Sequence, residues 1–413
     1  MPCLPVATEM RLAVVSPFLD RRHGTERCIV EQIERIAREP GWEIHLYSQR
    51  VEDISGVRFS EKSGSVPPGS IVWHKVPSIP GPLLFQFLWW FLANRVQRWF
   101  DARFRSLRFD LVYSPGINCF DADAVAVHIV FREFLRLARQ DLRLRDSRLT
   151  SWPRLIHRHL YYRLIIYLEK RIYPAPRLRL AAVSQLTASE LSRHYGRADV
   201  TVIPNAVEGA VFHPAGREQR REDARRQWTY APEDFVLLLV GNDWKKKGLP
   251  LLLEAMARCR DLPLRLLVAG RDDASPYRSL LKRLGVQDRV RFAEPSSDVM
   301  QFYAAADVYV GPSLHDSFAL PPAEAMACGL PVITSAQNGG AGMITSGVDG
   351  FVLDDPRDTA ALAQLLRLLW EQPELRRRMG ERAARTAQHY TWERNARETL
   401  AFLAETLRRK EAK

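Results

Sequence analysis

The chain has 413 residues, too many for one compact core and about right for two α/β domains of roughly 200 residues each. Hydrophobic residues make up 46% of it and charged residues 26%, which excludes global disorder and a multispanning membrane protein. With 60 Lys and Arg against 48 Asp and Glu, the formal net charge is +12, which favours anionic partners such as nucleic acid, acidic lipid headgroups or phosphorylated glycans. An arginine-rich proteome would produce the same charge with no function attached.

The cysteines and the N-terminal residues both favour a reducing compartment. Five cysteines are scattered along the chain without a CxxC pair or a Cys/His cluster, so neither a disulfide framework nor a zinc site is indicated. The first residues lack a basic segment followed by a signal-length apolar run. We therefore expect a cytoplasmic protein, in which the residues before Met10 are a short unstructured leader or an artefact of start-codon choice.

The first half of the chain predicts a doubly wound α/β domain. An apolar run at 11–18 precedes a polar turn with Gly24 and a helical pattern, the order of a strand, a loop and a helix. Further buried parallel strands are predicted at 42–48, 109–115, 124–130 and 180–184. The polar, charged stretch at 216–234 is expected to be the linker, so the first domain is assigned to 1–215.

The second half repeats the βαβ rhythm from FVLLLVG to LPVITS and predicts a second Rossmann-like domain at 216–390, with an amphipathic helix at 391–413. Open sheets bind ligands at the carboxyl ends of their strands, so two of them facing each other would form a cleft for two substrates. The chain has no GxGxxG after its first strand and no GxxxxGK[ST]. These absences argue against a nicotinamide enzyme and a P-loop NTPase.

The segment GPSLHDSFALPPAEAMACGLPVITS carries the strongest candidate chemistry. It predicts a strand, a loop with Asp316, and a helix that opens at a Pro-Pro pair and contains Glu324. The amides of Phe318, Ala319 and Leu320 would point outward at an anion, with help from the helix dipole. A diphosphate would fit this position.

This segment resembles the Glu-x7-Glu pair of retaining glycosyltransferases with the GT-B fold, in the large family 4 that includes sucrose synthases and lipopolysaccharide core glucosyltransferases. The resemblance implies two Rossmann-like domains, with the C-terminal helix returning to the N-terminal domain. It also implies that Glu324 binds the ribose hydroxyls of the nucleotide and that the first acid lies beside the donor sugar. Here the first acid is Asp316 instead of Glu, which moves the carboxylate by about 1.5 Å.

Other stretches match the family in order and spacing. GNDWKKKGLPLLLEA resembles its phosphate-binding strand end, so Lys247 and Lys245 would hold the donor diphosphate. IPNAVEGAVFHP resembles I-P-N-G-V-D-x-x-x-F-x-P and contributes Asn205. SPFLDRRHGTER resembles the Gly-rich first loop with Gly24, and AVAVHIVF places His128 near the donor sugar. One departure is NGGAGMI, where Gly342 stands in place of an acid that relatives often carry.

The resemblance implies transfer of a hexose, glucose from UDP-glucose in the first place, to a lipid-linked or lipopolysaccharide-type glycan with retention of configuration. The departing diphosphate would gain negative charge that the lysines and helix amides stabilise, while Asp316 and His128 would position the sugar and the acceptor. The family uses no cofactor and needs no metal. No Asp-x-Asp stands near a strand end; the triplet at 121–123 is expected to be a loop before a strand.

Each candidate also has a plain structural interpretation. The acidic pair could be a loop acid and a helix N-terminal acid, and the lysine run a solvated turn in which Lys246 faces water. A lone histidine in an apolar strand, such as His128, is more often a core residue. Asn205 fits turn chemistry. Arg271, after the strand LRLLVAG, could stack on the nucleotide base or lie on the surface.

Two stretches exceed what a Rossmann-like domain needs, the apolar run at 81–100 and the Arg- and aromatic-rich span at 131–179. The first is too short to cross a bilayer. Both could lie on an acidic membrane surface, or form a buried and a solvated helix. The residues assigned to the membrane interface are Phe85, Trp89, Trp90 and Trp99. On the membrane interpretation, the acceptor is presented at the cytoplasmic face of the inner membrane; no RNA-binding module is visible, so no nucleic-acid partner is expected.

Three function classes therefore stand beside one another: a glycosyltransferase, a sugar nucleotide epimerase of the same fold, and a membrane-binding scaffold with a decayed site. The presence of Lys247 and Glu324 argues against decay. An epimerase should act on the nucleotide sugar without an acceptor, whereas a transferase should release nucleotide only slowly until an acceptor is added.

Overall fold

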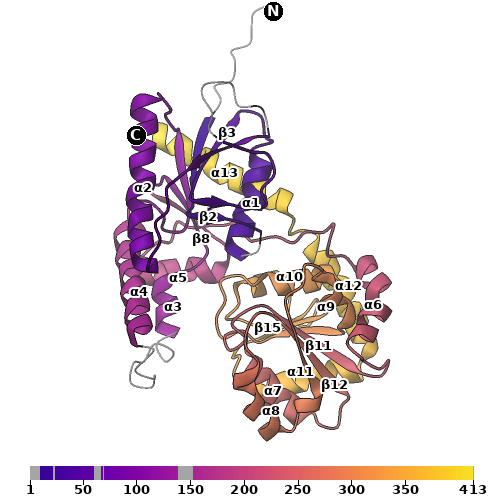
Figure 1. Ribbon diagram of the computed structural model, residues 1–413. Coiled ribbons are helices and arrows are strands. Elements are labelled where there is room, and N and C mark those ends of the chain that lie inside the picture. Colours follow the sequence, from indigo (N-terminus) through magenta and orange to yellow (C-terminus); the bar gives the residue numbers. More distant parts are fainter. Residues whose placement is uncertain (1–9, 22–23, 60–66, 68, 138–151, 413) are drawn as a thin grey trace, which may run out of the picture. The chain divides into compact units, whose positions relative to one another are not determined.

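The computed structural model describes residues 10–412 except 22–23, 60–66, 68 and 138–151 (Figure 1). The predicted leader, Cys3 and part of the Arg-rich span at 131–179 lie outside the described residues. The chain forms two compact units, which are Met1–Ile203 with Glu393–Lys413, and Pro204–Trp392.

The N-terminal unit is built on an eight-stranded parallel sheet in the order β10-β9-β8-β7-β1-β3-β6-β5. Its strands are β1 (Met10–Val15), β3 (Trp42–Ser48), β5 (Val57–Phe59), β6 (Ile71–Lys75), β7 (Leu111–Pro115), β8 (Ala124–Val127), β9 (Arg179–Ala182) and β10 (Thr201–Val202). The short strands β2 (Phe18–Leu19) and β4 (Arg50–Val51) pair separately. The sequence therefore predicted the central strands at nearly the observed positions.

Alternation along each strand divides the core of this unit into two layers. Leu12 and Val14 of β1 pack into one cluster, and Ala13 and Val15 pack into the other. The helices of the unit are α1 (Gly24–Ile36), α2 (Leu83–Phe104), α3 (Phe131–Leu137), α4 (Trp152–Ile172), α5 (Gln185–Tyr195) and α13 (Trp392–Glu411). Because both faces of the sheet are covered, its central strands β1, β7 and β8 are rich in apolar residues.

The C-terminal helix α13 returns to the N-terminal unit, as the family resemblance implied. Figure 1 shows it in yellow among the indigo and purple elements of that unit. Gln32 of α1 donates a hydrogen bond of 2.9 Å to Asn395, and Arg35 pairs with Glu393 at 2.9 Å. Leu403 of α13 is fully buried in the same cluster as the α1 side chains.

The C-terminal unit contains a six-stranded parallel sheet in the order β13-β12-β11-β14-β15-β16. Its strands are β11 (Phe235–Val240), β12 (Leu264–Ala269), β13 (Val290–Ala293), β14 (Val308–Gly311), β15 (Val332–Ser335) and β16 (Phe351–Leu353). The strand order reverses between β11 and β14, which makes this pair the topological switch point.

Helices cover both faces of this second sheet (Figure 1). The helix α7 packs against α8 and α11, while α6 packs against α9 and α10 packs against α12. Their bounds are α6 (Pro214–Gln227), α7 (Leu249–Arg258), α8 (Arg278–Leu284), α9 (Met300–Ala305), α10 (Leu320–Ala327), α11 (Thr359–Glu371) and α12 (Pro373–Ala387). Short 3-10 turns are η3 (Ser275–Tyr277), η4 (Gln287–Arg289) and η5 (Gly339–Met343). The structure therefore has the predicted class, two parallel-sheet α/β units.

The predicted linker at 216–234 was wrong, because most of it forms helix α6. This helix is anchored to the C-terminal unit by arginines rather than by an apolar stripe, and Arg221 pairs with Asp307 at 2.5 Å. The preceding residues also belong to this unit, since Phe212 packs edge-on against Tyr303 and Val207 bridges to Thr391. The division between the units therefore falls after Ile203 rather than after residue 215.

Candidate functional site

The candidate site of the C-terminal unit lies beyond the strands at the switch point. The loop after β11 carries the three lysines, and the loop after β14 carries Asp316. Loops that follow such neighbouring strands line the ligand crevice of open α/β sheets. Residues from two separate sequence motifs therefore meet at one edge of the sheet.

The central contact of this edge is an ion pair between Lys247 and Asp316. The Lys247 Nζ atom lies 2.5 Å from Asp316 Oδ2, and the two side chains are 13% and 22% exposed. The cation predicted for the diphosphate and the acid predicted for the sugar are thus direct neighbours. The pair is accessible from solvent, so a ligand can approach both groups.

Close approach of the two loops depends on Gly248, which has a φ of +86°. A Cβ atom at this position would lie 2.2 Å from the carbonyl oxygen of Pro312. The neighbouring backbone is tied in the same way, since the Leu314 amide donates to the Lys246 carbonyl at 2.7 Å. Glycine is therefore required for Lys247 to reach the β14 loop.

The other two lysines of the run differ in their surroundings. Lys245 is exposed on the same turn. The Lys246 Nζ atom pairs with Asp243 at 2.6 Å, with 32% of its side chain exposed. The expectation that Lys246 faces water therefore holds only in part, because the ammonium is engaged by a surface carboxylate.

The backbone around Asp316 is fixed by the segment that follows β15. The Asp316 amide donates to the carbonyl of Gln337 at 2.8 Å, and the Gly339 amide donates to the carbonyl of Asp316 at 2.8 Å. The loop acid is thus held on both sides, and its carboxylate is presented by a braced loop rather than a free one.

Two of the three amides predicted to face an anion have partners within the protein. The Phe318 amide donates to Asp316 Oδ1 and the Ala319 amide donates to Asn338 Oδ1, both at 3.2 Å. The prediction was wrong for these two amides, because side-chain acceptors from the chain itself lie over them. The Leu320 amide is the first of helix α10, and it does not donate to Asp316 or to Asn338.

Glu324 lies on helix α10 and is 6% exposed. Its Oε2 atom accepts a hydrogen bond of 2.7 Å from the hydroxyl of Tyr303, which is fully buried on α9. Burial, with Glu324 beside it, raises the pKa of Tyr303 well above its ordinary value. The tyrosine therefore stays protonated and acts as a permanent donor that orients the carboxylate.

The loop after β12 supports the lysine turn. Asp272 accepts hydrogen bonds from the amides of Asp243 at 3.0 Å and Trp244 at 2.7 Å. The Arg271 amide donates to Asn242 Oδ1 at 3.0 Å, and Arg271 itself is exposed. This exposure fits both interpretations of Arg271, stacking on a base and lying on the surface.

The remaining predicted residues are distributed over both units. His128 belongs to the N-terminal unit and directly follows β8 instead of lying inside it, because the strand ends at Val127. It is 8% exposed, and burial lowers its pKa to about 4, so the ring is neutral near pH 7. Gly24 begins α1 and is exposed, whereas Asn205 belongs to the C-terminal unit and is buried.

The Asp-Ala-Asp triplet is a loop before β8, as predicted. The carboxylate of Asp121 accepts hydrogen bonds from both terminal nitrogens of Arg98, each at 2.8 Å. Asp123 accepts the amide of Val112 and pairs with Lys410 of α13 at 2.9 Å. Both carboxylates therefore act as structural acceptors.

Sequence reasoning missed three side chains that shape the site. Tyr303 lies in the apolar pattern MQFYAAA, which gives no signal of a polar role. Asn338 follows β15. Its Oδ1 atom accepts hydrogen bonds from the amides of Ala319 and Gly340, and its Nδ2 atom donates to the hydroxyl of Thr334. Asp272 directly follows Arg271, and the position of both after a buried strand was the available signal. At Gly342, the position of the missing acid, an added Cβ would meet open space.

Two family models match the chain. The model described as Glycosyltransferase Family 4 matches residues 22–209, and the model described as Glycosyl transferases group 1 matches residues 220–386. Together they account for most of both units.

The curated relatives include D-inositol 3-phosphate glycosyltransferases from several bacteria. The protein of Streptomyces bingchenggensis is 34% identical over 247 residues, which covers 56% of this chain and 53% of the relative. The protein of Kineococcus radiotolerans is 35% identical over 248 residues, covering 54% and 56%. The chain thus spans about half the length of the curated relatives it matches.

Solved structures match over nearly the full length. WaaG, described as a glycosyltransferase involved in lipopolysaccharide biosynthesis, has a TM-score of 0.68 and 20% identity, covering 94% of this chain and 98% of its own. Sucrose-phosphate synthase from Thermosynechococcus elongatus has a TM-score of 0.70 at 19% identity, covering 96% and 98%. Anabaena HepE in complex with UDP-glucose has a TM-score of 0.65 at 18% identity, covering 96% and 100%.

At these identities the structural likeness establishes the fold, and the two family models establish the kinship. Each unit of the chain is matched by its own glycosyltransferase model, and the pair of parallel sheets is that of the solved enzymes. The chain belongs to the family 4 glycosyltransferases of the GT-B fold.

Proposed function

We propose that the protein transfers a hexose from a nucleoside diphosphate sugar, with UDP-glucose as the first candidate, to a lipid-linked or lipopolysaccharide-type glycan with retention of configuration. The ion pair between Lys247 and Asp316 carries this proposal. It joins a cation suited to a diphosphate with an acid suited to sugar hydroxyls, at the ligand-binding edge of a Rossmann-like sheet. HepE, which shares the fold and was solved with UDP-glucose, supports the choice of donor.

The chemistry assigns a separate task to each side chain. Cleavage of the bond between the sugar and the diphosphate leaves negative charge on the phosphate, which Lys247 and the N-terminus of α10 stabilise. Asp316 accepts hydrogen bonds from sugar hydroxyls. Glu324, oriented by Tyr303, accepts hydrogen bonds from the ribose hydroxyls. Lys245 adds positive charge at the rim of the site.

We assign His128 the role of a neutral hydrogen-bonding group toward the sugar. Its lowered pKa, about 4, means that it bears no charge near pH 7. A neutral ring can accept or donate through either nitrogen, depending on its tautomer. It does not supply the positive charge for the phosphate, so that task stays with the lysines.

The acceptor is proposed to be presented on an acidic membrane surface that contacts α2 and α4, at the cytoplasmic face of the inner membrane. These two helices lie side by side, and the Leu84 amide donates to His157 Nε2 at 3.2 Å (Figure 1). Large apolar side chains on this α2–α4 surface are between 45% and 61% exposed: Leu83, Phe85, Leu88, Leu92, Val96, Trp99, Phe100, Phe104, Ile156, Leu160 and Tyr167. Among the described helices, none is long and apolar enough to cross a bilayer.

Charge on the same helices favours anionic lipid over a neutral partner. Exposed basic residues are interleaved with the apolar ones: Arg95, Arg103, Arg158, Arg163, Lys170 and Arg171. Apolar burial combined with basic residues is the usual basis of interfacial membrane binding. Two expected interface residues differ in their placement, because Trp90 is buried and Trp89 donates to the carbonyl of Pro77, while Phe85 and Trp99 are exposed as predicted.

The names of the curated relatives favour a second acceptor class, a phosphorylated polyol such as inositol 3-phosphate. A formal net charge of +12 suits this acceptor and a phosphorylated glycan equally. Both acceptors therefore belong in the activity test.

The donor is tested by calorimetric titration with UDP, UDP-glucose, GDP and GDP-mannose, beside Glu324→Ala. We expect selective binding of UDP and UDP-glucose that the variant loses by at least about tenfold. Binding of GDP instead would change the donor, and no binding at all would move the function to the scaffold hypothesis.

Transfer is tested by following UDP release with and without acceptor, either inositol 3-phosphate or a lipid-linked glycan. Release that depends on acceptor supports transfer, whereas epimerised nucleotide sugar without acceptor would support the epimerase. Addition of EDTA is expected to leave the rate unchanged, in line with the proposal of metal-independent transfer.

Membrane contact is tested by sedimentation with vesicles of phosphatidylcholine, with and without phosphatidylglycerol. We expect binding to the acidic vesicles, which is lost when Phe85, Leu92 and Trp99 are all changed to Ser. Phe59→Ser is the control, because Phe59 is 62% exposed in the same unit but lies on β5. Equal loss in the control would contradict the α2–α4 surface.

A further inference from the structure

A hollow at the amino edge of the second sheet gathers arginines that the proposed reaction does not use. It is lined by Arg217 and Arg221 of α6, by Arg376 of α12 and by Asp307. Asp307 directly precedes β14, whereas the donor loop follows that strand. The hollow and the donor site are therefore at opposite edges of the same sheet.

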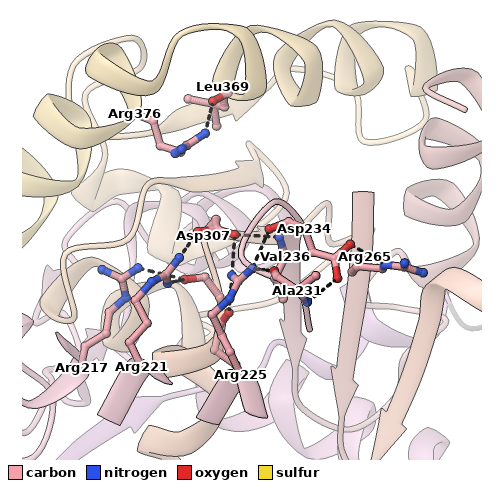
Figure 2. A network of polar contacts seen from close by, with 12 residues as sticks. Arg217, Arg221, Arg225, Ala231, Asp234, Val236, Arg265, Asp307, Leu369 and Arg376 are labelled. Carbon is pink, nitrogen blue, oxygen red and sulfur yellow. Dashed lines mark hydrogen bonds and ion pairs between the residues drawn. The ribbon is translucent and has the colours of Figure 1, made fainter. Parts of the chain in front are cut away.

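Figure 2 shows the arginines of α6 turned toward Asp307, with Arg376 on a separate helix. The single carboxylate of Asp307 is shared, since it accepts Arg221 at 2.5 Å and Arg225 at 3.2 Å. Arg217 and Arg376 instead donate to main-chain carbonyls, those of Ala306 at 2.9 Å and Leu369 at 2.8 Å. A carbonyl satisfies a hydrogen bond but does not neutralise a guanidinium charge.

The carboxylates at the rim do not supply the missing charge. Glu374 and Glu381 are both bound by Arg377, which accounts for one more arginine and two acids. The cluster thus contains three carboxylates, those of Asp307, Glu374 and Glu381. It contains five guanidinium groups, those of Arg217, Arg221, Arg225, Arg376 and Arg377. Two positive charges therefore remain uncompensated. They belong to Arg217 and Arg376.

Burial makes this excess charge costly. Desolvation, reinforced by the neighbouring Arg221, lowers the pKa of Arg217 to about 10, and the same two causes lower the pKa of Arg376. The Arg217 Nε atom is buried and has no hydrogen-bond partner in the described part of the chain. Arg376 also stands in the first turns of α12, where a cation opposes the helix dipole.

Packing explains only part of the cluster. Arg217, Arg221 and Arg225 stand on successive turns of α6 and bind carbonyls at the end of α9, which is a favourable position for cations. This role accounts for Arg221 and Arg225, which also share Asp307. It leaves the buried Nε of Arg217 without a partner. It also leaves Arg376 without a carboxylate, although its guanidinium lies over the ring of Phe235, 5.0 Å from the ring centre.

We propose that this hollow is a second anion site, which binds the phosphate group of a small molecule between Arg217 and Arg376. Guanidinium groups present planar pairs of donors that match phosphate oxygens. A dianion would cancel the two uncompensated charges. The site is separate from the donor site, and this inference does not depend on the proposed transfer reaction.

The experiment titrates the full-length protein with inorganic phosphate and with glucose 6-phosphate, in the presence of saturating UDP to fill any donor site. The comparison variants are Arg217→Gln with Arg376→Gln, and Arg220→Gln as the control. Arg220 lies on the same helix but pairs with Asp298 at the exposed surface. We expect the double variant to bind at least about tenfold more weakly and the control to match the unmodified protein.

The two ligands separate the sources of the phosphate. Tighter binding of glucose 6-phosphate would identify a phosphorylated metabolite, and equal binding would identify free phosphate; both support the site. A second measurement needs no variant: phosphate should raise the thermal midpoint of the unmodified protein, while chloride at the same ionic strength should not. The proposal would be overturned if neither ligand gave binding heat or raised the thermal midpoint. An equal loss of affinity in Arg220→Gln would also overturn it.

Discussion

The hydroxyl of Tyr303 donates a hydrogen bond of 2.7 Å to Oε2 of Glu324, with both side chains buried on adjacent helices of the C-terminal unit. The tyrosine hydroxyl stays protonated at neutral pH, because its pKa is raised well above the ordinary value. The acid proposed to hold the ribose is therefore oriented by a neutral donor.

Tyr303→Phe removes this donor while keeping the ring that packs in the core. We expect UDP to bind about tenfold more weakly, because a hydrogen bond to a charged group contributes about 1.5–3 kcal/mol. The ribose contact is the same in the ground state and the transition state, so kcat should change little while KM rises. Calorimetry and steady-state kinetics measure the two effects.

The matched control is Tyr230→Phe in the same unit. The Tyr230 hydroxyl is buried and has no hydrogen-bond partner in the described residues, so its removal should leave UDP binding unchanged. Equal weakening in both variants would show a general effect of the substitution and contradict the orienting role of Tyr303.

Lys247→Ala should separate the lysine proposed to bind the donor diphosphate from its neighbours. Lys247 is the lysine of the run that contacts Asp316, whereas Lys246 pairs with a surface acid. If Lys247 stabilises the departing diphosphate, its loss should lower kcat by about 100-fold or more. Lys246→Ala should stay within about threefold, since surface ion pairs contribute little.

The same experiment tests the coupling of the ion pair. Removing Lys247 leaves the Asp316 carboxylate without its partner, so the variants Lys247→Ala, Asp316→Asn and the double variant form a cycle. We expect non-additive losses in kcat, because both groups act on one bond. Strict additivity, or Lys247→Ala with nearly full activity, would contradict the proposed site.

The fold was largely predictable because its strands are buried on both faces. β1 ends in the apolar run LAVV and β11 is FVLLLV, which is the pattern that parallel sheets impose. Helix α6 was missed for the opposite reason. Its sequence is almost entirely polar, and its attachment comes from arginines bonding to Asp307 and to carbonyls, so it has no apolar stripe that sequence periodicity could reveal.

The site was predictable in its location but not in its contacts. Residues after the switch-point strands were expected to meet, and Lys247 and Asp316 do so. The sequence could not predict that the Lys247 ammonium pairs with Asp316, since a diphosphate and a carboxylate both attract an ammonium group. The amides of Phe318 and Ala319 were likewise expected to be free. The first instead donates to the side chain of Asp316 in the same loop, and the second donates to Asn338 in the loop after β15.

Gly248→Ala should lower the free energy of unfolding of the C-terminal unit by more than its backbone strain alone would. The φ of +86° already disfavours a side chain, and the added Cβ would lie 2.2 Å from the Pro312 carbonyl oxygen. Gly347 is a matched control, with a φ of +81° and no atom within 4 Å of an added Cβ. We expect a loss of about 1 kcal/mol for Gly347→Ala and at least about 3 kcal/mol for Gly248→Ala. Urea unfolding measures both, and equal losses would show that the contact with Pro312 is relieved by backbone movement.

Glu169 should make the stability of the N-terminal unit depend on pH. Its buried carboxylate accepts the amides of Phe131 and Arg132 at the start of α3 and the hydroxyl of Tyr195 at 2.5 Å. Burial is the main cause that raises its pKa from 4.5 to about 7. Because the folded pKa lies above the unfolded one, the contribution of this group is fully present below pH 4.5 and is lost as the pH rises through 7.

Glu169→Gln replaces the titrating group with a neutral amide, so the variant lacks this pH dependence. We expect the free energy of unfolding of the unmodified protein, relative to the variant, to fall by on the order of 3 kcal/mol between pH 5 and 8. Glu405→Gln is the control. A hydrogen bond from Arg409 lowers the pKa of Glu405, so this carboxyl group does not titrate between pH 5 and 8. Urea unfolding at several pH values measures the difference, and a flat or rising curve for the Glu169 pair would show that its carboxylate is already charged in the folded protein at pH 5.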